Sequence, residues 1–219
     1  MYAVDFGPTA MLQCERLDVD LSRLDGIYIT HLHGDHIGGI AMLLVYLQFK
    51  IERTRPLVIA GPEGMEARLA LLRESAYPSV LQRGLSFPIE FAHWKIPGTV
   101  DVLGRQVTAI RAEHDRLAIA SSLRVDTDSY SLSFSGDTGW QPKLAKLVEG
   151  TDMFICECSM ETADYWGHLS VAELLEHRPK LKVKRLVLSH MSEEARAAAH
   201  KQSTALDAII ADDGMILTL

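Results

Sequence analysis

A run of seven residues near the N-terminus constrains this chain more than any other feature. Thr30-His31-Leu32-His33-Gly34-Asp35-His36 holds four side chains that can bind a metal. The apolar segment before it, Gly26-Ile27-Tyr28-Ile29-Thr30, is typical of a short buried strand, and Gly38-Gly39 opens an apolar helix that reaches about Lys50. The run therefore predicts a metal site on a loop at the C-terminal end of a strand.

The spacing inside this run predicts two neighbouring metal positions. His31 and His33 stand two apart in an extended loop, so both can face one metal, whereas Asp35 and His36 turn toward a neighbour. Imidazole nitrogens and carboxylate oxygens suit zinc and other divalent first-row metals, and open sites of this kind are usually catalytic. The alternative is a solvated turn that happens to be rich in histidine, which explains such a density of ligands poorly.

The size and composition of the chain indicate its domain organisation and its location. At 219 residues, with 47% apolar and 23% charged residues, the chain is expected to form one domain over residues 1–219. The longest apolar stretch, around residues 40–47, is too short for a membrane span, and the N-terminus lacks the pattern of a secretory signal. We therefore expect a cytoplasmic protein without a membrane partner.

Charge and cysteine content restrict the partners further. A net charge of -7 disfavours a long nucleic acid, because phosphate neutralisation by a basic patch supplies much of the affinity for such substrates. The three cysteines, Cys14, Cys156 and Cys158, form an odd set and are expected to be reduced. A Cys-x-Cys zinc pair stays open as an alternative, although the chain lacks the second pair of a structural site.

Strands and helices alternate along the remainder, which predicts an α/β fold. The expected strands cover residues 56–60, 88–94, 106–113, 117–125, 129–134, 152–156, 184–188 and 214–219, with loops and short strands over 79–104. The expected helices lie after Gly61-Pro62 to about Ala76, at 140–148, at 170–177 and between Ser192 and Ala211. The three strands within residues 106–134 are separated by short polar turns, so we expect an antiparallel meander there.

The motif T-H-L-H-G-D-H-I-G-G resembles the signature of the metallo-β-lactamase superfamily, and especially its ribonuclease Z and phosphodiesterase branch. This resemblance implies a four-layer αββα sandwich with the metals at one edge. It also implies further ligands in a fixed order: His114 for the first metal, Asp137 of Ser135-Gly136-Asp137-Thr138 as the bridge, and His190 for the second metal. Taken alone, each of these can be explained as a hydrogen-bonded histidine or a favourable turn sequence. Together and in this order, they indicate metal ligands.

The full set of residues implied by the resemblance serves two divalent metal ions, zinc or manganese. The metal ligands are His31, His33, Asp35, His36, His114, Asp137 and His190, and Asp35 is also counted with the catalytic groups. Gly167-His168-Leu169-Ser170 is similar to the G-H-S-T of the phosphodiesterases, so His168 is expected to protonate the leaving oxygen while a metal-bound hydroxide attacks, with Glu157 orienting its ring. His168 as a mere helix-start histidine is the alternative.

The chain departs from this family pattern in two places. Family members normally begin with a further strand pair before the segment that corresponds to Tyr2-Ala3-Val4-Asp5-Phe6-Gly7, so a strand pair is expected to be missing and a homodimer could cover the sheet edge. Ribonuclease Z enzymes usually insert a basic arm between the positions of His114 and Asp137, where only two strands and a turn fit here. We therefore expect a small or nucleotide-like phosphodiester, as in the cyclic-phosphate phosphodiesterases of phosphonate metabolism.

Several points stay open at this level. A thioester, lactone or β-lactam hydrolase of the same superfamily, or a metal-binding scaffold without turnover, would carry the same ligands. Tyr165 and Trp166 either line the substrate pocket or pack internally. His177 and His200 are expected on solvent-facing helix positions, and His93 in an apolar strand with no partner motif in the sequence.

Overall fold

The computed structural model describes residues 1–219, except for the side chains of Leu81 and Gln82. The chain divides into two compact units, Met1–His93 and Trp94–Leu219. Each unit is built around one sheet with its own helices. The expectation that residues 1–219 fold and function as one domain stays a prediction.

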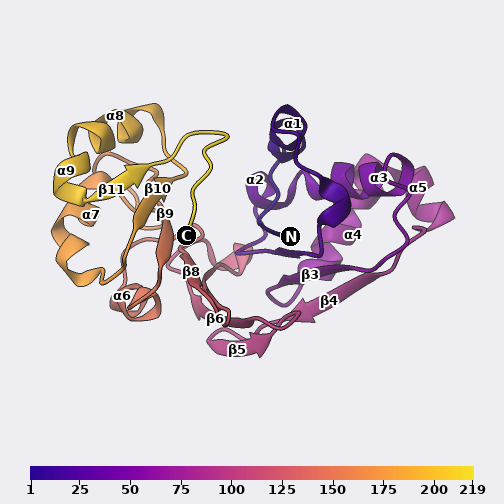
Figure 1. Ribbon diagram of the computed structural model, residues 1–219, viewed down its shortest axis with the longest axis horizontal. Coiled ribbons are helices and arrows are strands. Elements are labelled where there is room, and N and C mark those ends of the chain that lie inside the picture. The colour runs from indigo at the N-terminus through magenta and orange to yellow at the C-terminus, as the bar shows by residue number, and fades with distance from the viewer. The chain divides into compact units, whose positions relative to one another are not determined.

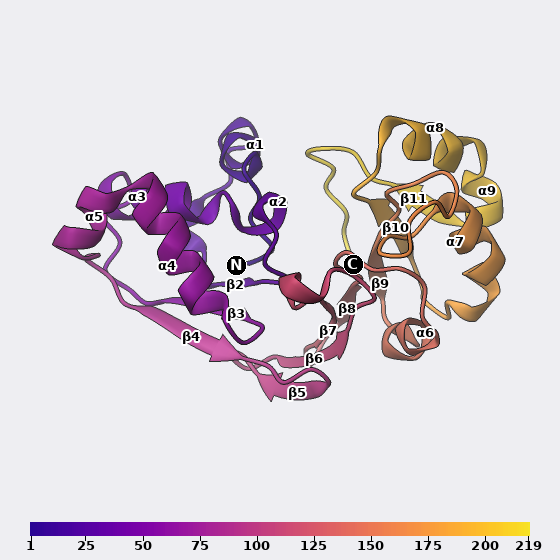
Figure 2. The same ribbon diagram turned by 180° about the vertical axis from the view of Figure 1, so that it is seen from behind.

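The first unit contains a four-stranded parallel sheet in the order β1-β2-β3-β4. Its strands are β1 (Tyr2–Val4), β2 (Gly26–Tyr28), β3 (Leu57–Gly61) and β4 (Ile89–His93). Its helices are α1 (Ala10–Arg16), the short η1 (Leu21–Arg23), α2 (Gly34–Ile37), α3 (Ile40–Phe49), α4 (Met65–Ala76) and α5 (Pro78–Arg83). All five residues of β3 are buried, which explains its continuous apolar sequence. Helices α3, α4 and α5 lie together on one side of this sheet (Figures 1 and 2).

The second unit contains a seven-stranded mixed sheet in the order β11-β10-β9-β8-β7-β6-β5. Its strands are β5 (Gly98–Asp101), β6 (Gln106–Arg111), β7 (Ser121–Asp126), β8 (Ser131–Phe134), β9 (Met153–Glu157), β10 (Leu186–Ser189) and β11 (Ala208–Ile210). Strands β5 to β8 pair antiparallel, as the predicted meander requires, and β8 to β11 pair parallel.

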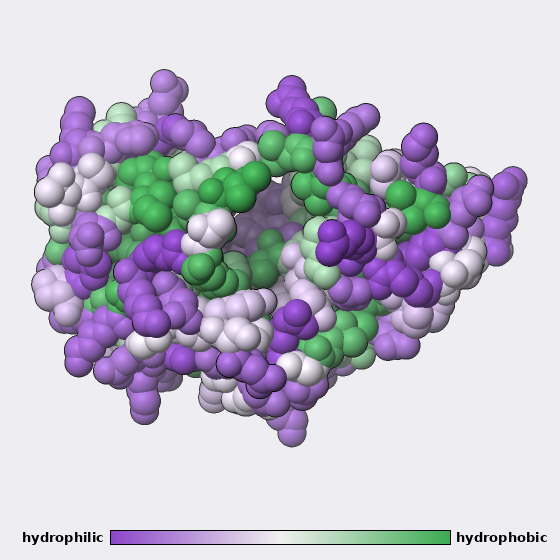
Figure 3. All heavy atoms as spheres, in the orientation of Figure 1, coloured by the Kyte–Doolittle hydropathy of each residue, from purple (hydrophilic) through white to green (hydrophobic). Residues whose placement is uncertain are grey.

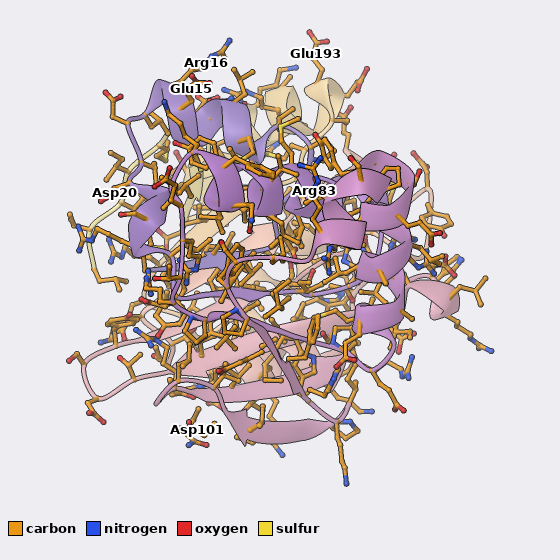
Figure 4. The ribbon with its side chains drawn as sticks, turned by 90° about the vertical axis from the view of Figure 1, so that its right-hand side faces the viewer. Glu15, Arg16, Asp20, Arg83, Asp101 and Glu193 are labelled. Carbon is orange, nitrogen blue, oxygen red and sulfur yellow. The ribbon has the colours of Figure 1, made fainter. Side chains whose placement is uncertain are left out.

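The helices of the second unit are η2 (Arg116–Ala118), α6 (Pro142–Val148), α7 (Val171–His177), η3 (Arg178–Lys180), α8 (Glu193–Lys201) and α9 (Ser203–Leu206). Of these, α7, α8 and α9 lie beside the parallel strands β9, β10 and β11 (Figure 1). Helix α7 begins at a capping box in which Ser170 and Glu173 satisfy each other's backbone amides. Helix α8 is capped by Ser192 and carries Glu193 in its first turn, where a negative charge suits the helix dipole; that side chain projects outward (Figure 4).

The apolar core of the second unit lies between these helices and the parallel strands. It includes Phe154 on β9, Leu188 on β10 and Leu174 on α7, each fully buried. Cys156 and Cys158 belong to the same core, and burial raises the pKa of the Cys158 thiol to about 12. All three cysteines are free, as expected, and this core leaves Cys156 and Cys158 among apolar neighbours rather than as a zinc pair.

Charged side chains lie on the surface of the first unit. In the first unit, Glu15 and Arg16 of α1 and Asp20 beside η1 point outward (Figure 4). Apolar side chains nevertheless reach the surface in both units (Figure 3), and Leu12, Met42 and Phe49 of α1 and α3 are about half exposed. Among the helices of the described chain, none has the length and hydropathy needed to cross a bilayer.

Four predictions about elements are wrong. Residues 214–219 form no strand; the last strand is β11, which already pairs with β10 at the sheet edge, and Ile216 is 85% exposed. That strand also interrupts the helical stretch expected up to Ala211. The strand expected from Leu117 begins only at Ser121, because Arg116–Ala118 form a turn of 3-10 helix capped by Asp115. Helix α5 lies where only loops and short strands were expected.

One histidine prediction also needs correction. His177 is 9% exposed rather than solvent-facing, because its ring stacks on Trp140 with centroids 4.0 Å apart. His93 lies at the end of β4, as expected of a strand residue, and its Nε2 lies 2.8 Å from Glu66 on α4. His200 is exposed, as predicted.

Candidate metal centre

The histidine-rich loop of the first unit is held by close backbone contacts with the end of β1. The Phe6 amide donates to the His36 carbonyl at 2.7 Å, and the Gly39 amide donates to the Phe6 carbonyl at 3.0 Å. A Cβ atom on Gly39 would overlap the Gly7 carbonyl oxygen, so only glycine permits this approach. His33 precedes the first turn of α2, which then presents Asp35 and His36.

Three imidazole rings gather at this loop. The ring centroids of His31 and His36 are 4.0 Å apart, and those of His31 and His33 are 4.9 Å apart. His31 is fully buried and His36 is 9% exposed, whereas the side chain of Asp35 is 61% exposed, with Oδ2 3.5 Å from His36 Nε2. Buried imidazoles at such distances would repel one another if all were protonated, so the cluster suits neutral rings that share a cation.

Asp5, which follows β1, orients two of these rings, His36 directly and His31 through Thr30. Its carboxylate accepts hydrogen bonds from the Thr30 amide at 2.8 Å and the Thr30 hydroxyl at 2.7 Å, and it lies 2.7 Å from His36 Nδ1. A carboxylate only accepts, so His36 Nδ1 carries the proton and Nε2 keeps its lone pair. The Thr30 hydroxyl has given its one hydrogen to Asp5, so at 3.1 Å it accepts from His31 Nδ1. Both rings are thereby left with a basic Nε2, the state a metal ligand needs.

The second unit places His114 and His190 on either side of the buried Asp137 carboxylate. His114 Nε2 lies 3.9 Å from Oδ2 of Asp137, and His190 Nε2 lies 3.7 Å from Oδ1. Asp137 is 3% exposed and His114 is 6% exposed. His114 follows β6, Asp137 follows β8 and His190 follows β10, so three strand ends of one sheet supply these residues.

His114 is fixed in the tautomer that a metal ligand requires. Its Nδ1 lies 2.7 Å from the Gly167 carbonyl oxygen, which only accepts, so Nδ1 is protonated and Nε2 faces Asp137 with its lone pair. A lone pair and a carboxylate at this separation repel unless a cation stands between them. The donor set of each unit therefore fits a divalent metal.

Glu157, the last residue of β9, collects four donors although it is 3% exposed. Oε1 accepts from the Thr138 amide at 2.7 Å and lies 2.9 Å from His168 Nδ1. Oε2 accepts from the Ser159 amide at 3.2 Å and from the Ser159 hydroxyl at 2.5 Å. His168 is thus oriented with Nδ1 protonated, and its ring lies 4.8 Å from that of His114.

Two of the strand-end residues have backbone conformations that are unusual for side-chain-bearing residues. Asp5 has φ = 56° and His190 has φ = 53°, in the left-handed region. Such conformations cost of order 1 kcal/mol or more outside glycine, and they persist where the surrounding contacts over-determine them. Both residues turn the chain sharply at the end of a parallel strand, which aims their side chains at the histidine clusters.

The residues singled out in the sequence fall into these two groups. His31, His33, Asp35 and His36 come together in the first unit, while His114, Asp137, Glu157, His168 and His190 come together in the second. Sequence reasoning missed Asp5, Thr30 and Ser159. Asp5 and Ser159 could have been suspected, because each lies just beyond a predicted or possible strand end, but neither belongs to the quoted motif.

Known proteins share this architecture along nearly the whole chain. The metallo-β-lactamase fold protein YhfI from Bacillus subtilis superposes with a TM-score of 0.75 and 18% identity, over 98% of this chain and 86% of that one. A diphosphatase from the PhnP family also gives 0.75 at 18% identity, over 99% of this chain and 79% of that one. A ribonuclease Z from Parabacteroides distasonis is 24% identical over 273 residues, spanning 100% of this chain and 90% of the relative.

These findings define the class of the protein as a metal-dependent hydrolase of the metallo-β-lactamase fold, which confirms the predicted fold and superfamily. Within that class, the family model described as anti-Pycsar protein Apyc1 matches residues 2–209, and the chain belongs to that family. The ribonuclease Z relatives place it in the branch that its sequence motif indicated.

Proposed function

We propose that this chain hydrolyses a small or nucleotide-like phosphodiester with two divalent metal ions. The ligands proposed for the ions are His31, His33, Asp35, His36, His114, Asp137 and His190. The observation that carries the proposal is the buried Asp137 carboxylate, which has a histidine Nε2 within 4 Å of each oxygen. One carboxylate with a separate imidazole at each oxygen is the arrangement expected of a bridging ligand between two metals.

The chemistry follows from the ligand types. When bound, two divalent ions would lower the pKa of a water toward neutrality and offset charge on a phosphoryl oxygen. His168, held through Nδ1 by Glu157, is the proposed general acid, and it would deliver a proton from Nε2 to the leaving alkoxide oxygen. Glu157 stabilises the protonated ring because its carboxylate lies 2.9 Å away and is itself fixed by three other donors.

A small substrate is supported by two observations. Residues 115–136 are occupied by η2, β7, β8 and their turns, and the net charge of the chain is -7, which suits a long polyanion poorly. Two large aromatic side chains stand beside the proposed acid: Tyr165 is 45% exposed and Trp166 is 59% exposed, and the Tyr165 ring centroid is 5.8 Å from that of His168. Exposed aromatic rings can stack on a nucleobase, which supports a nucleotide-like substrate.

The metals are proposed to be zinc or manganese. Histidine-rich ligation favours zinc, whereas a carboxylate bridge also accommodates manganese. Metal analysis after purification from defined medium, followed by reconstitution of the metal-free protein with each ion, would decide between them. The ion that restores turnover at a stoichiometry of two per chain is the functional one.

The test of the function uses bis-p-nitrophenyl phosphate with the metal-replete protein. We expect turnover that falls by about 10²–10⁴-fold in His168→Ala, the range for loss of a general acid. His200→Ala is the matched control, since His200 is exposed on α8, and it should keep full activity.

Three outcomes would overturn parts of this proposal. Hydrolysis of a thioester, lactone or β-lactam without phosphodiester turnover would change the bond that is cleaved. Metal-replete protein that is silent on all of these substrates would indicate a scaffold. Cleavage of precursor transfer RNA at a higher kcat/KM than nucleotide-like diesters would remove the small-substrate part.

A homodimer is a further part of the proposal. The first unit exposes Leu12, Met42 and Phe49 on α1 and α3, and β1 lies at one edge of its sheet, both of which a second copy could cover. Light scattering during gel filtration should give twice the chain mass of 24.3 kDa, and Met42→Glu should shift the protein toward monomer. A monomer at all concentrations would contradict it.

A further inference from the structure

Ser159 lies two residues beyond β9 and contacts more of the site than its size suggests. Its hydroxyl oxygen is 2.5 Å from Glu157 Oε2, 2.8 Å from His190 Nδ1, 3.0 Å from the His190 carbonyl oxygen and 3.4 Å from His168 Nδ1. It therefore stands between the residue proposed to orient the general acid and a residue proposed as a metal ligand. No motif in the sequence pointed to it.

Counting hydrogens decides the direction of these bonds. A serine hydroxyl has one hydrogen, while a carboxylate and a carbonyl oxygen only accept. Whether that hydrogen goes to Glu157 or to the His190 carbonyl, none remains for His190 Nδ1. The distance of 2.5 Å to Glu157 is that of a charge-assisted O–H···O⁻ bond, so the hydrogen goes there. His190 Nδ1 must then be the donor at 2.8 Å.

We propose that Ser159 is a positioning residue: its hydroxyl holds His190 with Nδ1 protonated and Nε2 presented toward Asp137, and links this ring through Glu157 to His168. The inference rests on the proposed function for its reaction, but the hydrogen-bond chain exists without it. The chain runs from His190 to Ser159, from Ser159 to Glu157, and from His168 to the other oxygen of Glu157.

The need for such a residue follows from the exposure of His190. Its side chain is 36% exposed, compared with 4% for His114, so packing restricts the His190 ring far less. An imidazole at a solvent-facing strand end can flip its ring and change tautomer unless a hydrogen bond opposes both. Ser159 supplies that bond, and it also accounts for two of the four donors to the buried Glu157 carboxylate, through its amide and its hydroxyl.

The test compares Ser159→Ala with Ser159→Thr, which keeps the hydroxyl. Titration of metal-free protein with zinc and with manganese chloride should show a loss of about 10–100-fold in affinity for one equivalent in Ser159→Ala, the range for removing a partner of a ligating histidine. Ser159→Thr should recover most of it. Ser133→Ala is the matched control, because the buried Ser133 hydroxyl on β8 has no hydrogen-bond partner among the described residues, and it should bind both equivalents normally.

A second measurement determines the tautomer of His190 in the wild-type protein. Nitrogen-15 spectra of the histidine side chains in the metal-free wild-type protein, with His190 assigned by its loss in His190→Gln, should show the tautomer with hydrogen on Nδ1. With metal saturating, Ser159→Ala should lower kcat on bis-p-nitrophenyl phosphate while KM changes less than about twofold, because substrate contacts remain while the orientation of Glu157 and His168 is loosened.

The inference and the proposed function can fail separately. Wild-type affinity for both equivalents in Ser159→Ala, an Ser159→Thr variant no better than Ser159→Ala, or hydrogen on Nε2 of His190 would each overturn the role of Ser159. If the wild-type protein cleaves no phosphodiester but Ser159→Ala still weakens metal binding, the proposed substrate fails and the positioning role stands.

Discussion

The two units of this protein orient their histidine rings through the same kind of hydrogen-bond network, built from different residues. In the first unit, Asp5 contacts His36 Nδ1 directly and reaches His31 Nδ1 through the Thr30 hydroxyl. In the second unit, Glu157 contacts His168 Nδ1 directly and reaches His190 Nδ1 through the Ser159 hydroxyl. Each unit thus uses one carboxylate and one hydroxyl to fix a proton on Nδ1 of two imidazoles.

The units differ in where these residues come from. The first unit draws its histidines from a single loop of six residues, and tight glycine contacts hold that loop against the end of β1. The second unit draws its residues from the ends of β6, β8, β9 and β10 and, for His168, from the segment before α7, so most of their distances depend on strand register. The pairing of Ser189 with Glu157, for example, places His190 beside Ser159. The positions of the residues in the first cluster are therefore determined by the local backbone conformation. Those in the second cluster are determined mainly by strand pairing.

The largest effect that would break this comparison is expected at Asp137, which has no counterpart in the first unit. Asp137→Asn should lower kcat/KM by at least about 10³-fold, because several kcal/mol of charge stabilisation depend on the proposed bridge and each 1.36 kcal/mol is a factor of ten. Metal content measured by inductively coupled plasma spectrometry should fall below two ions per chain. Retention of both metals and of activity would show that Asp137 is an ordinary turn residue.

The next largest effect compares the two carboxylates directly. Asp5→Asn and Glu157→Gln should each weaken metal binding or activity by about 10–100-fold, since both remove a partner of ligand or acid histidines. Asp5→Asn should act mainly on metal affinity, measured by zinc titration, whereas Glu157→Gln should act mainly on kcat. If both variants affect the same parameter to the same degree, the two networks are not specialised as proposed.

A smaller effect tests the local backbone path in the first unit. Gly39→Ala should destabilise the protein by about 1–3 kcal/mol, because its Cβ would overlap the Gly7 carbonyl and force a backbone shift. Gly34→Ala is the matched control for stability: a Cβ there meets nothing within 4 Å, so its unfolding free energy should stay the same or rise slightly. Denaturant unfolding of both variants, read by fluorescence, makes the comparison. Equal stability of the two would contradict the close-approach argument.

The smallest effect concerns the sheet of the second unit at the opposite end of β9. The hydrogen bond from Lys184 and those from Ser131 lower the pKa of Asp152 from 3.8 to about 2. A lowered folded-state pKa gives stability that is fully present above the unfolded value of 3.8 and is lost as pH falls through 2. Asp152→Asn should therefore lower Tm slightly at pH 6, and the difference from wild type should shrink between pH 4 and pH 2. A difference that stays constant over this range would rule out the ionic contribution.

The sequence alone was informative wherever the signal was local. The histidine run, the strand ends that carry His114, Asp137 and His190, and the antiparallel meander were all readable, because alternation of apolar residues and turn chemistry act over a few positions. Local patterning was misleading for residues 214–219, whose apolar residues suggest a strand although β11 already occupies the edge beside β10. It also gave no sign that His177 would stack on Trp140.

Tertiary structure alone decided how the candidate site is organised within each unit. The proton positions on His31, His36, His114 and His190 follow from contacts with Thr30, Asp5, the Gly167 carbonyl and Ser159. Several of these partners lie 31 or 53 positions away along the chain. The sequence shows which residue types can bind a metal and where they stand along the chain. The tautomer of an imidazole depends instead on the hydrogen-bond acceptor that the fold brings to its other nitrogen.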